Sequence, residues 1–197
     1  VFSFISCSNN DTPSEPIKII IEGAAVSPEV GGPNQPNQVY VDLSSNTTTV
    51  VKRDSWDLGF YSGSDFRVTI NGALYMAAGQ LSTTDIDAIT STTTEVQDLQ
   101  SKVAVGTFDA ANTIYVDNPE GNITETAIAE ISDINTENNV YLLNLGYEIG
   151  TETPTTGNVN ISGDSRGWKK IRIVKSGSDY VLQYADLDDT THNEVVI

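Results

Sequence analysis

The fold is decided by two neighbouring stretches, Trp168-Lys169-Lys170-Ile171-Arg172-Ile173-Val174 and Tyr180-Val181-Leu182-Gln183-Tyr184-Ala185. Both are rich in β-branched and aromatic residues, as strands are. Between them lies the cluster Ser176-Gly177-Ser178-Asp179, whose residue types favour a turn. The sequence therefore predicts an antiparallel β-hairpin.

Outward from this hairpin, the chain contains further short runs with strand character, separated by turn signals. The predicted strands are 18–22, 39–43, 48–51, 56–61, 66–70, 113–116, 127–131 and 140–145. The turn signals include Gly31-Gly32-Pro33, Asn71-Gly72 and Pro119-Glu120-Gly121-Asn122. We find no internal repeat and no linker in the middle of the chain, so we expect a mostly β protein with a single antiparallel β domain over residues 17–197.

One segment has helical character. Ser82-Thr83-Thr84-Asp85 has the spacing of a capping box, and Ile86 and Ile89 follow three residues apart. Val96, Leu99 and Val103 continue a helix-like spacing, but the threonine-rich stretch 90–94 interrupts it. We expect one or two short helices here.

Composition excludes several classes of protein. The chain has 197 residues, of which 38% are hydrophobic and 19% charged, which is enough apolar material for a core. Its net charge of −17 argues against nucleic-acid binding, which needs clustered cations. With one His, one Met and one Cys, the chain holds no His/Cys zinc site and no internal disulfide, and a catalytic triad could use only His192. No P-loop, GxSxG or HExxH motif occurs, and we do not expect an enzyme.

Charged residues cluster in three places. Five of the ten cations lie in residues 166–175, for which we expect a solvated basic strand facing acidic neighbours; a local site for a carboxylate or phosphate is the alternative. The acidic stretches 85–87 and 186–189 are expected to be solvated turns, because neither has the Gly and distal Glu of an EF-hand calcium loop. A calcium site with carboxylate ligands is the alternative.

The first residues resemble the end of a bacterial lipoprotein signal peptide, with Phe4-Ile5-Ser6-Cys7 as the lipobox. Val1 is not an initiator Met, so we expect an upstream piece. We interpret residues 1–16 as a signal remnant and flexible tether, with Cys7 acylated as a lipid anchor; an incidental or buried cysteine is the alternative. No segment has the ~20 apolar residues of a transmembrane helix, so membrane contact is expected through this anchor only.

Two motifs and the hairpin carry a resemblance to a known family. Ser55-Trp56-Asp57-Leu58-Gly59-Phe60-Tyr61 and Phe66-Arg67-Val68-Thr69-Ile70-Asn71-Gly72, followed by the hairpin at 169–184, resemble the HmuY haem-binding lipoproteins. The resemblance implies an all-β, HmuY-like lipoprotein, anchored in the outer membrane of Bacteroidetes-type bacteria and exposed on the cell surface. It would take haem from haemoproteins and pass it to a TonB-dependent receptor.

The same residues can be interpreted physically. Trp56, Leu58 and Phe60 fall on one face at a period of two, so we expect them in the core. Asp57 points the other way and could pair with Arg67 across a hairpin, while Asn71-Gly72 predicts a tight turn.

The family resemblance implies iron ligation by two His, or by Met in relatives, from the second half of the domain. This chain has neither residue between Met76 and His192, so two His ligands within one chain are impossible. If haem binds, we expect Tyr147 or Met76 to contact the iron, because Tyr and Met can both ligate haem. If Leu145-Gly146-Tyr147 corresponds to the strand end that carries the second family histidine, Tyr147 stands where the resemblance implies that ligand. Each residue also has a purely structural interpretation. Tyr147 would pack at the end of a strand, and Met76 would fill the hydrophobic core.

Two further residues and two further functions stay open. Tyr115 lies in the region of the first family ligand, and His192 is an alternative contact near the end of the chain. The alternative to haem capture is a surface lipoprotein that binds a protein or glycan and no haem. A secreted hydrolase is the third option, although no pair of carboxylates is marked out for it.

Overall fold

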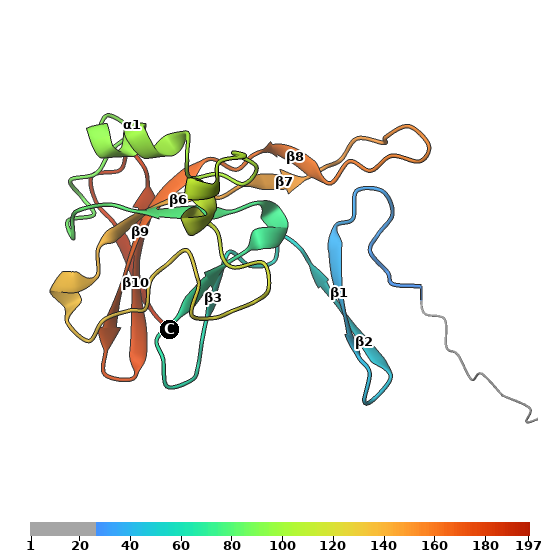
Figure 1. Cartoon of the computed structure of the whole chain (residues 1–197), viewed down its shortest axis with the longest axis horizontal. Coiled ribbons are helices and arrows are strands. Elements are labelled where there is room, and N and C mark those ends of the chain that lie inside the picture. Colours follow the sequence, from blue (N-terminus) through green and yellow to red (C-terminus); the bar gives the residue numbers. More distant parts are fainter. Residues whose placement is uncertain (1–26) are drawn as a thin grey trace, which may run out of the picture.

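The computed structural model describes residues 27–197, and its centre is a five-stranded antiparallel sheet with strand order β11-β10-β9-β6-β5 (Figure 1). Its strands are β5 (Ala77–Gln80), β6 (Val140–Asn144), β9 (Trp168–Ser176), β10 (Asp179–Asp186) and β11 (Asn193–Val196). Three two-stranded antiparallel sheets pair β1 (Asn37–Asp42) with β2 (Thr47–Lys52), β3 (Leu58–Phe60) with β4 (Val68–Ile70), and β7 (Tyr147–Ile149) with β8 (Ser162–Ser165). The expectation of a mostly β, antiparallel fold is confirmed.

The hairpin that the sequence predicts is formed by β9 and β10. Ser176 pairs with Asp179, so the turn has two central residues, and Gly177 has a φ of +66° that favours glycine. Ile173 lies opposite Leu182, and Ile171 opposite Tyr184. Cross-strand neighbours share a face of the sheet, so this register places the four apolar side chains together.

The helices within residues 27–197 are few and short. They are α1 (Thr94–Gln100) and the 3₁₀ helices η1 (Gly72–Leu74), η2 (Ala110–Tyr115) and η3 (Asn135–Glu137). The predicted helix start at residues 82–85 is wrong. Thr83 Oγ1 accepts from the Asp85 amide at 3.1 Å and Asp85 Oδ1 from the Asp87 amide at 3.2 Å, and such local bonds favour turns over helix. Of the predicted apolar positions, Ile86, Ile89, Val96 and Val103 are nevertheless buried, and Leu99 is partly buried.

Several predicted strands differ from the structure. Residues 113–116 belong mainly to η2, and residues 127–131 form no strand. Strand β5, with the sequence Ala-Ala-Gly-Gln, was not predicted because its small side chains show no alternation. The predicted strand 18–22 and the domain boundary at residue 17 lie outside the described residues, as does Cys7. Within residues 27–197, no helix is long and apolar enough to cross a membrane.

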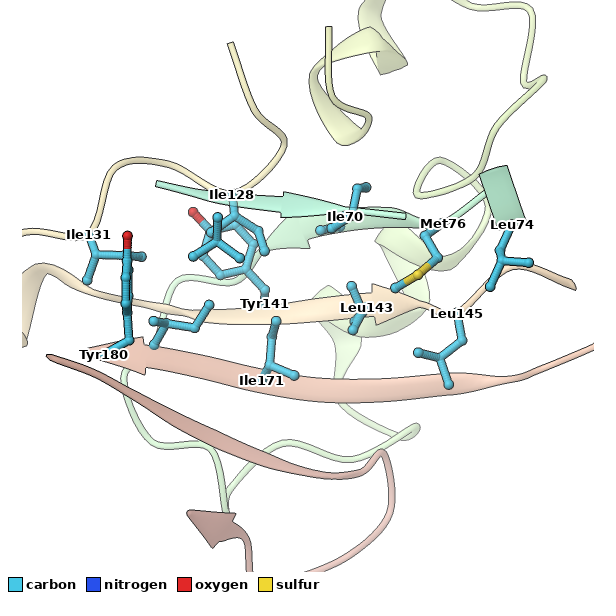
Figure 2. Packing of buried hydrophobic residues seen from close by; sticks show 13 residues of the cluster. Ile70, Leu74, Met76, Ile128, Ile131, Tyr141, Leu143, Leu145, Ile171 and Tyr180 are labelled. Carbon is cyan, nitrogen blue, oxygen red and sulfur yellow. The ribbon is translucent and has the colours of Figure 1, made fainter. Parts of the chain in front are cut away.

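Apolar side chains cover both faces of the five-stranded sheet. On one face, Tyr141, Leu143 and Ile171 pack with side chains from β3–β4 and from residues 127–131 (Figure 2). On the other face, Val140 and Leu142 pack with a cluster that includes Val96 of α1. The sheet therefore lies between two layers, and β5 at its edge directly follows residues 70–76, which form part of the candidate site.

The ion pairs differ from the expected one between Asp57 and Arg67. Asp57 pairs with Arg166 at 2.8 Å, and Arg67 pairs with Glu130 at 2.6 Å. The register of β3 and β4 explains the difference, because the Asp57 carbonyl accepts from the Asn71 amide at one end of the ladder. Arg67 lies at the opposite end, where its carbonyl accepts from the amide of Tyr61.

The basic stretch of β9 is only partly solvated. Lys169 pairs with Asp186 of β10, and Lys175 with Asp133, as expected for cations beside acidic neighbours. Lys170, however, has no exposed surface. Its Nζ donates to the carbonyl oxygens of Ile89 at 2.5 Å and Asp189 at 2.6 Å, and burial lowers its pKa.

Candidate ligand-binding site

A cavity of about 570 Å³ lies between two segments, residues 70–76 and residues 104–119. Apolar side chains in its lining include Ile70, Met76, Val105, Phe108 and Val116. Small-molecule sites are concave, mostly apolar and about 300–1,000 Å³ in volume, so the cavity has the size and character of such a site.

Asn71 organises the first of these segments. Its side chain is completely buried, and Nδ2 donates to the carbonyl oxygens of Arg53 and Trp56, both at 2.7 Å. Oδ1 accepts from the Ala73 amide at 3.1 Å and so caps η1. The turn predicted at Asn71-Gly72 is therefore present as a 3₁₀ helix, and it positions the chain that enters β5 through Met76.

The second segment is built around η2. Asp109 Oδ1 accepts from the Ala111 amide at 2.9 Å and caps this helix, which explains why residues 113–116 do not form the predicted strand. Asp117 connects the two segments, because its carboxylate accepts from the amides of Ile70 at 2.9 Å and Ala127 at 2.8 Å. Burial raises the pKa of Asp117.

Met76 is part of the cavity lining, but its side chain is also part of the core and has no exposed surface. In Figure 2 its sulfur lies among Ile70, Leu74 and Leu143. The thioether could reach a ligand in the cavity only after a change of its rotamer.

Tyr147 lies in β7, outside the cavity lining, and its side chain is half-exposed. Its ring packs edge-on against Tyr75, with ring centroids 6.2 Å apart and planes at 77°. Tyr75 has a φ of +63°, an uncommon backbone conformation for a residue other than glycine. The structure therefore places Tyr147 and Met76 in different surroundings and does not bring them together in one site.

The other two candidate contacts also lie outside the cavity. Tyr115 is on η2, and its ring lies over Gly79 of β5, where a Cβ would be 3.5 Å from the ring. His192 Nδ1 lies 2.9 Å from Asp87 Oδ1, in the layer that covers the opposite face of the sheet. Among residues 27–197, no group of three or more His, Cys, Asp or Glu residues is arranged to hold a metal ion.

Sequence reasoning missed the apolar rim of the cavity. Val105 and Phe108 lie on its lining, and Ile114 lies on the adjoining hollow next to η2; all three are exposed. The available signal was a set of large apolar residues in a segment that is rich in Gly, Asn and Asp and has no strand or helix periodicity.

The lining can be tested against the iron porphyrin that the sequence resemblance implies. The volume and the apolar character suit a flat macrocycle. Haem iron is held by His, Met, Cys or Tyr, and Met76 is the only one of these residue types in the lining. The cavity therefore fits a porphyrin with at most one axial ligand from this chain.

Comparison with known proteins gives one result. The family model described as HmuY protein matches residues 34–186, which is most of the chain and includes both segments of the cavity. Neither a curated protein nor a solved structure gives a significant match. The chain belongs to the HmuY family.

Proposed function

We propose that this protein is a non-enzymatic, lipid-anchored binding protein of the bacterial outer membrane that captures haem or a related porphyrin. The observation that carries the proposal is the apolar cavity of about 570 Å³ between residues 70–76 and 104–119, in a chain of the HmuY family. Burial of a porphyrin against such a lining gains affinity mainly through the hydrophobic effect.

Two residues of the chain are proposed as iron contacts. Met76 is the first, because it is the residue of a haem-ligating type in the cavity lining, and a change of its rotamer would bring the thioether to the ligand. Tyr147 is the second, because its phenol is half-exposed. It lies in β7 outside the cavity lining, so ligation by Tyr147 would place the porphyrin against β7 and not in the cavity. Either residue would supply a single axial ligand, so we propose that affinity depends more on apolar contact than in a site with two His ligands.

A titration of the purified protein with hemin tests the proposal. We expect a shift of the Soret band, and Met76→Leu or Tyr147→Phe should change the position of that band if the residue ligates iron. Tyr40→Phe is the matched control, since Tyr40 is an exposed tyrosine of β1 outside the cavity lining. No shift in either oxidation state would refute haem capture, and an unchanged shift in the double variant Met76→Leu/Tyr147→Phe would refute these ligands.

The remaining steps of the proposal concern location and partners. Acylation of Cys7 would anchor the protein, and haem taken from a haemoprotein would pass to a TonB-dependent receptor. Cys7→Ser should move the protein from the membrane fraction to the soluble fraction. Unchanged membrane association of this variant would refute the anchor.

A second candidate function is favoured by the β1–β2 hairpin, which extends away from the central sheet (Figure 1). Its large apolar residues Tyr40, Val41 and Val50 are exposed, as is Leu43 in the connecting turn. Such a surface suits a lipoprotein that binds another protein and no haem. Failure to bind hemin, together with partner binding that is lost in Tyr40→Ser/Val41→Ser, would favour this function.

A further inference from the structure

Phe108 combines two unfavourable features at the rim of the cavity. Its side chain is fully exposed, although exposing a large apolar side chain to water is unfavourable in free energy. Its φ is +55°, a left-handed conformation that residues other than Gly, Asn and Asp seldom adopt. Unfavourable conformations that persist in a folded protein tend to occur at functional sites.

The surrounding loop holds Phe108 in this position. On one side, Gly106 has a φ of +80°, which allows the chain to turn. On the other side, Asp109 caps η2, and Asn112 Nδ2 donates to Thr107 Oγ1 at 3.1 Å across the base of the loop. The loop is therefore fixed at both ends, and Phe108 is displayed at its apex.

The place of Phe108 in the cavity lining indicates what its side chain could contact. Phe108 is part of the lining of the cavity, together with Ile70 and Met76 from the opposite segment. A ligand between the two segments would lie next to the exposed Phe108 and against the segment that holds Ile70 and Met76. An aromatic ring offers a large, rigid contact area and stacks in an offset geometry on other π-systems.

We infer that Phe108 stacks on the ligand and makes the cavity selective for flat, unsaturated molecules. This inference rests on the proposed function. It adds a contact that does not depend on the iron, so the site should hold an iron-free porphyrin through the same ring.

The test compares hemin and protoporphyrin IX, titrated into the protein and followed by quenching of tryptophan fluorescence. Phe108→Gly should weaken the binding of both by about tenfold, because it removes the stacked ring. Phe108→Tyr should bind within about twofold of the native protein, because it keeps the ring. Ile134→Ala is the matched control, since Ile134 is an exposed apolar residue outside the lining of the cavity, and it should bind like the native protein.

Thermal unfolding of the ligand-free variants separates binding from folding. Glycine adopts a positive φ without strain, so Phe108→Gly should not lower Tm by more than about 2 °C. A larger fall would show that Phe108 is structural and would overturn the inference. If the native protein binds both porphyrins and Phe108→Gly binds them equally well, the ring makes no ligand contact and only this inference fails. If the native protein binds neither porphyrin, the proposed function fails as well.

Discussion

Replacement of Asn71 should be among the most destabilising substitutions in this protein. Asn71→Ala removes two hydrogen bonds of 2.7 Å and one of 3.1 Å, and it leaves the carbonyls of Arg53 and Trp56 and the amide of Ala73 without these partners. At about 1 kcal/mol per bond, with an added penalty for buried groups left unpaired, the loss is about 3–4 kcal/mol. The corresponding fall in Tm is about 10 °C for a protein of this size.

Urea unfolding followed by tryptophan fluorescence measures this loss. Asn158→Ala is the control, because Asn158 is exposed and its side chain donates only to Thr155 Oγ1 at 2.6 Å; its effect should be below about 1 kcal/mol. Hemin affinity should also fall in Asn71→Ala, since η1 and Met76 lose their support. A loss of stability no larger than that of the control would refute the role assigned to Asn71.

Asn71→Asp refines the same prediction. The new carboxylate would face two carbonyl oxygens in a buried place, so its folded-state pKa should be raised. An acid with a raised folded-state pKa loses stability as the pH increases through its unfolded value toward its folded one. We therefore expect Asn71→Asp to be closer in stability to the native protein at pH 4 than at pH 7, and an equal deficit at both values would contradict this expectation.

Three further predictions concern stability. Burial lowers the pKa of Lys170, so the unfolded chain binds the ammonium proton more tightly than the folded protein does. The free energy of unfolding should therefore rise as the pH increases toward 10.5, and urea unfolding of Lys170→Met should lack that rise. Gly146→Ala should lose about 3 kcal/mol in the same assay, because its Cβ would lie 1.9 Å from the Leu74 carbonyl oxygen at a φ of +71°; a loss below about 1 kcal/mol would contradict the packing. Because the pKa of Asp117 is raised in the folded protein, the free energy of unfolding should fall as the pH increases from 3.8 toward the folded-state pKa. Urea unfolding of Asp117→Asn over a pH series should lack this fall.

The sequence predicted the parts of the fold whose pattern is local. The β9–β10 hairpin was predictable because two runs of β-branched and aromatic residues and a glycine turn lie within one short stretch. The turn at Asn71 was predictable because Asn-Gly has a strong local preference. Residues 113–116 were predicted as a strand, although most of them belong to η2, because the decisive contact is a single cap from Asp109. Strand β5 depends on pairing with β6, more than 60 residues later in the chain, and its own sequence does not indicate this pairing.

The candidate site was less predictable than the fold. Met76 was singled out by residue type, and the structure places it on the cavity lining but also in the core. Phe108 was missed because its importance lies in exposure and backbone conformation, which tertiary structure determines. The partners of Asp57 and Arg67 were mispredicted because a pair within one hairpin was assumed, whereas Arg166 is 109 residues from Asp57.

A crystal structure of the protein with hemin tests the central claim most directly. We expect the macrocycle between residues 70–76 and 104–119, with the Phe108 ring on one face and at most one axial ligand from the same chain. Hemin bound elsewhere on the molecule, or held by two ligands of one chain, would contradict this account.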